Sequence, residues 1–134
     1  MEKIKTTYIG DLRTKAFHVR SGTEIITDAP VDNQGKGEAF SPTDLLATSL
    51  GSCMLTLMGI AARDNGFSVV GTRVETTKIM VPNPRRVGEL KVYIFLPPND
   101  YTENQKELIR AAVDECPAAR SLHPEIKQNI CFHF

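Results

Sequence analysis

One uncharged run constrains this chain more than any other feature. Residues 45–62 (LLATSLGSCMLTLMGIAA) contain no charged side chain and one thiol, Cys53. Such a run suits a membrane span, a core helix with an inert thiol, or a core helix with a reactive one. It has only about the minimum length of a spanning helix, includes four hydroxyl side chains and two glycines, and follows a charged segment without a signal-peptide pattern. We predict a buried central helix in a cytoplasmic protein.

Composition places the chain among single-domain globular proteins. Its 134 residues are 24% charged and 41% hydrophobic, which is enough for a hydrophobic core, so we expect one domain over residues 1–134. The formal net charge is zero and the basic residues are scattered, which argues against nucleic-acid or membrane partners. The three cysteines form no CxxC pair and no HxxxH spacing exists, so we predict neither a metal site nor a cofactor.

The hydrophobic pattern alternates between the periods of strands and of helices, which predicts an α+β fold. Strands are expected at residues 4–9, 16–20, 23–27, 67–81, 87–96 and 127–134, and helices at residues 42–65, at about 102–116 and, as a short turn, at 117–122. Residues 67–81 and 87–96 are expected to form a hairpin, in which Leu90, Val92, Ile94 and Leu96 share the face toward the core. A turn is expected at Ser21-Gly22, and residues 28–40 break all periodicity and form a long loop.

The start of the central helix is well marked. Ser41 can cap it, Pro42 suits its first position, and Asp44 stands three residues after Ser41, where a carboxylate completes a capping box. The expected apolar stripe contains Leu46, Leu50, Cys53, Leu57 and Ile60. The remaining faces are also apolar, so the helix should be surrounded.

Two cysteines lie on apolar stripes of the two main helices. Packing these helices together could bring Cys53 and Cys116 close. Because free cysteine is among the most buried residue types, an inert core role is the commoner case for either thiol taken alone. The spacing of 63 residues does not decide between the two roles.

Two separated segments carry a family resemblance. The string SPTDLLATSLGSCMLT, followed later by ECPAARSLHPEI, resembles the two cysteine signatures of the OsmC/Ohr family, the osmotically induced and organic-hydroperoxide-resistance proteins. The similarity covers nearly the whole chain. The segments around the two cysteines, GSCML and CPAARSLHPEI, resemble the broad OsmC-like branch more than the Ohr branch. The resemblance implies antiparallel sheets packed around a long buried central helix, in an intertwined homodimer.

The resemblance also implies a thiol peroxidase. Cys53 would attack a hydroperoxide as a thiolate and become a sulfenic acid, and Cys116 would resolve it as a disulfide. An external dithiol, lipoyl-type or other, would then reduce the disulfide. Organic hydroperoxides are the expected substrates, with hydrogen peroxide as an alternative. An apolar pocket lined by Phe40, Met54, Leu57 and Met58 is expected to receive them.

The thiolate needs a cation from outside the helix. Cys53 lies about three turns beyond Pro42, whereas the influence of the helix dipole fades within the first turn. The family uses an arginine held by a carboxylate, and aligning the Ser21-Gly22 turn assigns this role to Arg13, with Arg20 as the alternative.

The carboxylate position departs from the family pattern. The family commonly has NPE or NPEE before the helix, whereas this chain has Thr43 at the position of the first glutamate. Asp44 matches the second acidic position and is our candidate catalytic carboxylate, with Glu38 as an alternative. The departure bears on peroxidase efficiency more than on the fold.

Two other functions remain open at this stage. A non-catalytic protein that binds a small molecule on the same fold is one of them. A cysteine hydrolase or thioesterase, with His123 activating Cys53, is the less favoured one. Cys131 has no reactive counterpart in the family and is assigned to packing.

Overall fold

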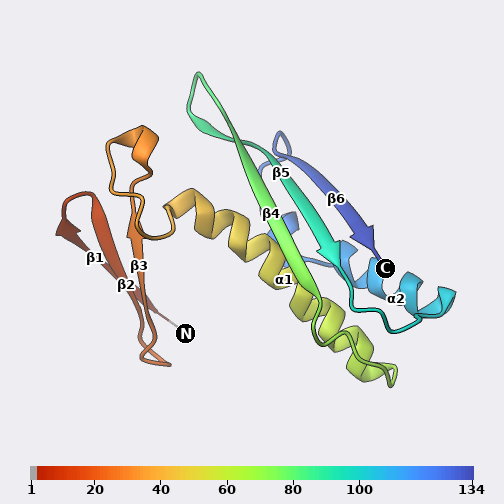
Figure 1. Cartoon of the computed structure of the whole chain (residues 1–134). Coiled ribbons are helices and arrows are strands. Elements are labelled where there is room, and N and C mark those ends of the chain that lie inside the picture. Colours follow the sequence, from red (N-terminus) through yellow and green to blue (C-terminus); the bar gives the residue numbers. More distant parts are fainter. Residues whose placement is uncertain (1–2) are drawn as a thin grey trace. The chain divides into compact units, whose positions relative to one another are not determined.

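A computed structural model describes residues 3–134. In chain order the elements are β1 (Ile4–Gly10), β2 (Arg13–His18), β3 (Glu24–Asp28), the 3-10 turn η1 (Val31–Asn33), α1 (Pro42–Asp64), β4 (Arg73–Val81), β5 (Arg86–Phe95), α2 (Glu103–Asp114), α3 (Pro117–Arg120) and β6 (Lys127–His133). The α+β class is confirmed. The chain divides into two compact units, one ending at Leu46 and the other comprising residues 47–134 (Figure 1).

The first unit is a three-stranded antiparallel sheet in the order β1-β2-β3. The predicted turn at Ser21-Gly22 joins β2 to β3, and Gly22 adopts the left-handed φ of 75° that such a turn favours. The amide of His18 donates to the carbonyl of Thr23 across this turn. The strand β2 starts at Arg13, three residues earlier than predicted, because the β1–β2 turn is confined to Asp11 and Leu12, both in the left-handed region.

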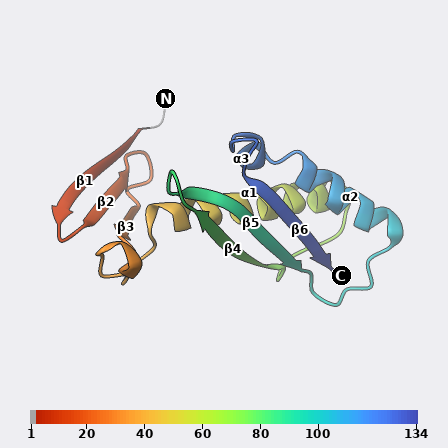
Figure 2. The same ribbon diagram turned by 90° about the horizontal axis from the view of Figure 1, so that it is seen from above.

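The second unit places helices on one face of the sheet β4-β5-β6 (Figure 2). The hairpin of β4 and β5 is antiparallel, as predicted, whereas β6 pairs in parallel with β5. A parallel partner needs a long crossover connection, and the segment carrying α2 and α3 supplies it. The expectation of antiparallel sheets is therefore wrong for this strand and correct for the pairs β1–β2, β2–β3 and β4–β5.

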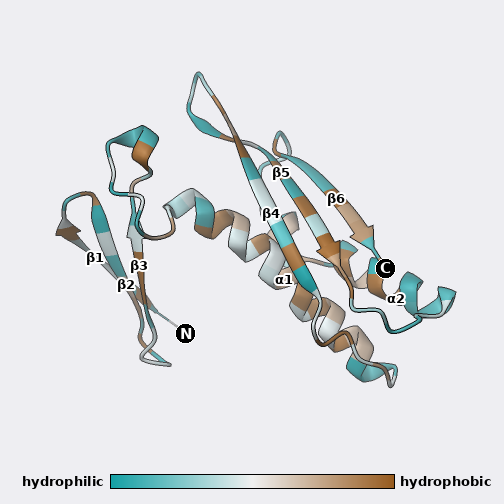
Figure 3. Ribbon diagram, viewed as in Figure 1, coloured by the Kyte–Doolittle hydropathy of each residue, from teal (hydrophilic) through white to brown (hydrophobic). Residues whose placement is uncertain are grey.

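The core of the second unit lies between the sheet and the helices. Alternate residues of β5 are fully buried, as the sequence pattern predicted: Leu90, Val92 and Ile94. They are accompanied by Leu50, Met54 and Met58 of α1 and by Ile109 of α2. Each such side chain contributes about 1.5–3 kcal/mol by leaving water. Figure 3 shows the same concentration of apolar residues along α1 and β5.

The helix α1 begins at the predicted residue and ends one residue early. The Ser41 side chain accepts a hydrogen bond from the Asp44 amide, and the Asp44 carboxylate accepts one from the Ser41 amide, which is the predicted capping box. The buried face, however, runs through Leu50, Met54 and Met58, and Ile60 of the predicted stripe is 50% exposed. By length and composition α1 passes a test for membrane-spanning helices, a test that core helices of soluble proteins also pass.

The strand β4 begins six residues later than predicted. Residues 67–72 form a turn, in which Gly71 has a φ of 94° and the Thr72 hydroxyl donates to the carbonyl of Val69. Phe67, at the start of this segment, packs against Tyr101 with the two rings edge to face. Local turn bonds therefore outweigh the strand propensity of the valines in this segment.

Candidate functional site

The first unit holds one strongly paired arginine. Arg13 opens β2 and lies opposite Asp28, the last residue of β3. Its Nε and Nη2 atoms donate to the two carboxylate oxygens of Asp28 at 2.7 and 2.9 Å. Asp28 is fully buried, whereas the Arg13 side chain is 27% exposed. A bidentate pair of this kind fixes the plane of the guanidinium.

The segment after β3 wraps around this carboxylate. The amide of Glu38 donates to Asp28 Oδ2 at 3.1 Å, and the amide of Asp28 donates to the carbonyl of Phe40. Gly35 passes so close to Ala29 that an added Cβ would lie 1.7 Å from the Ala29 carbonyl oxygen. The long predicted loop is therefore a tightly folded cover over Asp28.

The ion pair shifts the pKa of both partners, Arg13 and Asp28. The hydrogen bonds from Arg13 lower the pKa of Asp28, and the amide of Glu38 acts in the same direction. The hydrogen bond to Asp28 in turn raises the pKa of Arg13. Arg13 is thus cationic and Asp28 anionic at every pH near neutrality.

The other charged residues predicted for the site, Asp44, Glu38 and Arg20, take no part in the bidentate pair of Arg13 with Asp28. The Asp44 carboxylate caps α1 through the Ser41 amide, and the ion partners of Arg13 within residues 3–134 are Asp28 and Glu38. Glu38 approaches Arg13 Nη2 at 3.7 Å with a side chain that is 66% exposed, so its ion pair is the weaker one. Arg20 lies in the exposed turn between β2 and β3.

Sequence reasoning missed Asp28, although a signal for it was present. A hairpin that pairs residue 18 with residue 23 across the predicted Ser21-Gly22 turn also pairs Arg13 with Asp28. Extending the strand register from this turn therefore predicts that Arg13 and Asp28 are directly opposite each other on neighbouring strands.

The second unit brings the two predicted reactive thiols together. Cys53 lies in the middle of α1 and is half-buried, whereas Cys116 lies between α2 and α3 and is fully buried. The side chain of Cys53 lies close enough to Cys116 to add to the rise in the pKa of that thiol. Two cysteines 63 positions apart in the sequence are thus neighbours in the fold.

The local fold around Cys116 determines the protonation state of its thiol. It is the N-cap of α3, where Pro117 occupies the first turn and the Cys116 Sγ accepts from the amide of Ala119 at 3.4 Å. Gln128 of β6 holds this turn by donating to the carbonyl of Ala119. Burial raises the pKa of Cys116, and the hydrogen bond from Ala119 only partly opposes it. Cys116 is therefore a protonated thiol near neutral pH.

The third cysteine departs from its predicted role in packing. Cys131 lies in β6 and is exposed, with its Sγ 3.7 Å from Nε2 of His133. The strand β6 alternates between exposed and half-buried residues, and Cys131 falls on the exposed side. His123, the candidate base of a hydrolase, accepts a hydrogen bond from the amide of Glu125.

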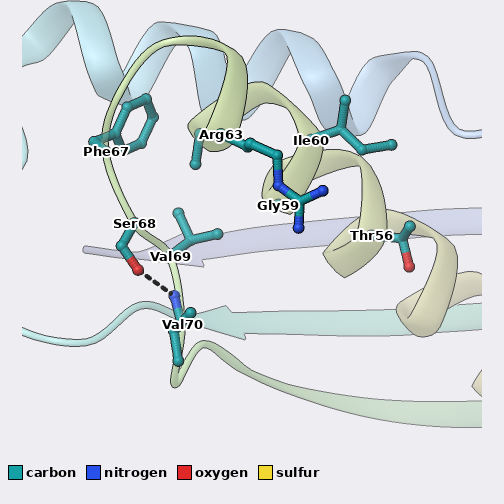
Figure 4. A pocket seen from close by; sticks show the side chains of 9 residues that line it. Thr56, Gly59, Ile60, Arg63, Phe67, Ser68, Val69 and Val70 are labelled. Atoms are coloured by element: carbon teal, nitrogen blue, oxygen red, sulfur yellow. Dashed lines mark hydrogen bonds between the residues drawn. The ribbon is translucent and has the colours of Figure 1, made fainter.

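A cavity of about 490 Å³ lies at the C-terminal end of α1 (Figure 4). Its lining residues are Thr56, Gly59, Ile60, Ala62, Arg63, Phe67, Ser68, Val69 and Val70. Met54 and Met58, which were expected to line a substrate pocket, are fully buried in the core instead. Within the described residues, no group of three or more His, Cys, Asp or Glu side chains is arranged to hold a metal ion.

Comparisons with known proteins agree on one family. A model of the OsmC-like protein family matches residues 35–130. A solved Psychrobacter arcticus structure, provisionally named an osmotic stress induced and detoxification response protein, is 53% identical. The match covers 99% of this chain and 96% of that one, with a TM-score of 0.94. A search of curated protein sequences gives no significant match.

More distant structures share the fold. An organic hydroperoxide resistance protein OsmC from Legionella pneumophila is 14% identical with a TM-score of 0.76, over 100% of this chain and 97% of that one. The organic hydroperoxide resistance protein OhrB of Bacillus subtilis is 13% identical with a TM-score of 0.70, over 99% and 98% of the two chains.

Proposed function

Because this chain belongs to the OsmC/Ohr family, we propose that it is a thiol-dependent peroxidase in which Cys53 attacks the peroxide and Cys116 resolves the product. The observation that carries the proposal is the proximity of the two thiols, which lie close enough for Cys53 to influence the pKa of Cys116. The names of the Legionella and Bacillus proteins suggest organic hydroperoxides as substrates. Hydrogen peroxide is the smaller alternative.

The proposed reaction balances with these two thiols. The Cys53 thiolate attacks the terminal oxygen of a hydroperoxide ROOH, the O–O bond breaks, and the sulfur becomes a sulfenic acid while the alkoxide leaves. The alkoxide takes a proton and departs as ROH. Cys116 then attacks the Cys53 sulfur as a thiolate, the S–S bond forms as the S–O bond of the sulfenic acid breaks, and the leaving hydroxide takes a proton from solvent to become water. An external dithiol, lipoyl-type or other, reduces this disulfide by exchange.

The raised pKa of Cys116 suits the resolving role. A thiol that stays protonated at neutral pH does not compete with Cys53 for the peroxide, since only a thiolate is nucleophilic. Its proton also lies near Cys53, where the alkoxide is released from the attacked peroxide oxygen. Transfer of that proton to the alkoxide would release ROH and leave Cys116 as the thiolate that attacks Cys53.

We propose that Arg13 supplies the positive charge that favours the Cys53 thiolate. Arg13 stays charged, is held rigidly by its pair with Asp28, and is the arginine that the family resemblance assigns. A cation within about 4–6 Å of a thiol favours its ionised form. Asp44, the other predicted catalytic residue, contributes in this proposal by capping α1.

A homodimer is the proposed working form. The first unit exposes large apolar side chains from its strands and its loop, among them Ile4, Tyr8, Val31 and Phe40 at 68, 64, 74 and 54%. Apolar surface of this extent marks an interaction site. Sedimentation equilibrium tests this proposal, which predicts twice the monomer mass.

Counting thiols tests the peroxidase. The fully reduced protein has three thiols, and one equivalent of cumene hydroperoxide should leave one, with Cys53 and Cys116 joined in a disulfide found by peptide mass spectrometry. Cys53→Ser should abolish the loss of both thiols. Retention of all three thiols in the wild type contradicts the proposal.

The same assay separates the other two functions. A hydrolase would turn over a thioester without losing thiols, and its activity would depend on His123. A binding protein would do neither and would gain thermal stability with ligand. Hydrogen peroxide in place of cumene hydroperoxide then measures substrate preference.

A further inference from the structure

We propose that Asp28 is the positioning residue for Arg13, in place of the carboxylate that the family resemblance puts at the start of α1. This inference rests on the proposed role of Arg13 toward Cys53. The orienting carboxylate is then at the end of β3, whereas the family resemblance predicts it at the start of α1.

The geometry of Asp28 is that of an orienting group. Both of its oxygens are engaged by Arg13, and one of them also accepts from the Glu38 amide, so the carboxylate cannot rotate without losing hydrogen bonds. The carboxylate is itself fully buried, where such bonds are strong and costly to break.

The pair leaves one edge of the guanidinium available. Asp28 uses Nε and Nη2, and the nearest further carboxylate oxygen, of Glu38, lies 3.7 Å from Nη2. Nη1 takes no part in the pair with Asp28, and the side chain is 27% exposed. An arginine held by one edge presents the other to an anion in a fixed direction.

The other charged groups near the pair do not orient the Arg13 guanidinium in the same way. Glu38 and Asp11 act on Arg13 only through space, and Lys36 acts so on Asp28 while forming an exposed ion pair with Asp11. The 81% exposed side chain of Asp11 lies in the β1–β2 turn. Among residues 3–134, Asp28 is thus the group that accepts hydrogen bonds from the Arg13 side chain.

A positioning role and a simple charge effect predict opposite results. Replacing Asp28 by Asn removes a negative charge beside Arg13, so through-space electrostatics alone would strengthen the positive field and make Cys53 more reactive. Loss of orientation would instead weaken the interaction with Cys53 and make it less reactive. A role confined to folding would leave the reactivity of Cys53 unchanged.

The test measures alkylation of Cys53 by iodoacetamide across pH, read out by mass spectrometry of its peptide in the full chain. We expect Arg13→Ala to slow the reaction about tenfold at neutral pH, since an opposite charge moves a titration by about one unit or more. Asp28→Asn should slow it at least about threefold and raise the pH midpoint. Glu24→Gln, an exposed carboxylate of the same strand, is the matched control and should not change it.

The double variant Arg13→Ala/Asp28→Asn completes the cycle. If Asp28 acts through Arg13, the double variant reacts no more slowly than Arg13→Ala alone. Additive losses contradict the inference, as does an unchanged or lowered midpoint in Asp28→Asn. If Asp28→Asn does not fold, Arg13→Lys replaces it, because lysine keeps the charge but lacks the planar fork, and wild-type reactivity in that variant overturns the inference.

This experiment separates the inference from the function on which it rests. Alkylation needs no peroxide, so loss of two thiols to peroxide with no effect of Asp28→Asn overturns the inference alone. An unchanged rate in Arg13→Ala removes both Arg13 and Asp28 from the mechanism. Retention of all thiols with peroxide overturns the peroxidase whatever the alkylation shows.

Discussion

Cys53, in the middle of α1, is a neighbour of Cys116, which is fully buried at the start of α3, and it lies close enough to influence the pKa of that thiol. The two residues differ in exposure, because Cys53 is half-buried. This asymmetry suits an ordered pair, in which the more exposed sulfur meets a reagent first and the buried one follows.

Replacing Cys116 should halt the reaction at the sulfenic acid. We expect Cys116→Ser to lose one thiol to one equivalent of cumene hydroperoxide, with Cys53 trapped by dimedone, because no neighbouring sulfur remains to form the disulfide. The control Cys131→Ser changes an exposed cysteine and should still form the Cys53–Cys116 disulfide. A disulfide between Cys53 and Cys131 in the Cys116 variant would contradict the assignment.

The burial of Cys116 should make stability fall at alkaline pH. Its pKa is raised in the folded state, so the folded protein holds this proton more tightly than the unfolded chain does. The contribution is fully present below the unfolded value of about 8.5 and is lost as pH rises from there through the folded value. Urea unfolding of the reduced protein between pH 7 and about pH 10 measures this loss. Cys116→Ala should reduce it, and an equally steep loss would refute this explanation.

The Arg13–Asp28 pair should make stability fall in acid. Because the pKa of Asp28 is lowered in the folded state, its contribution is present above the unfolded value of about 3.9 and is lost as pH falls through the folded one. Thermal unfolding scans from pH 6 downward measure it. Asp28→Asn should flatten the profile below pH 4, whereas Glu24→Gln, whose ion pair with Lys15 spans 3.9 Å at the surface, should follow the wild type.

Strong local signals explain the parts of the fold that the sequence predicted. The capping pattern at Ser41 and Asp44 fixed the start of α1, and the alternation through Leu90, Val92 and Ile94 identified the buried face of β5. These features depend on neighbours in sequence or on one repeated period, which a single chain displays directly.

Non-local pairing explains what the sequence did not predict. Nothing in the composition of β6 distinguishes a parallel from an antiparallel partner, and its alignment with β5 is set by the path through α2 and α3. The predicted stripe through Ile60 failed for a similar reason. On a helix that is apolar nearly all round, the pattern does not select which face meets the sheet.

The role of Asp28 was hidden by its place in the chain. It stands at the start of a segment read as loop, where a carboxylate is ordinarily solvated, and only the register of β2 against β3 brings it to Arg13. The search for a partner at Thr43 and Asp44 followed the family pattern instead. A change of position for one charged group is compatible with a retained fold, because the pair forms within a single hairpin.

Two glycines of α1 should respond differently to the same change. An added Cβ at Gly51 would lie 3.0 Å from Val74 Cγ1 and 3.2 Å from Thr76 Oγ1, whereas one at Gly59 would meet no atom within 4 Å. Alanine favours a helix over glycine by about 1 kcal/mol at either position. At Gly51 the crowding against β4 should cost about 1–3 kcal/mol and outweigh that gain, because a packed interface accommodates an extra methyl poorly.

We therefore expect Gly51→Ala to lower the free energy of unfolding and Gly59→Ala to leave it equal or raise it. Urea denaturation with an unchanged m-value measures both variants, each serving as the control for the other. Because both changes improve helix propensity equally, any difference between the variants reports packing alone. A Gly51→Ala protein as stable as Gly59→Ala would contradict the close approach of α1 to β4, the contact that holds the Cys53 helix against its sheet.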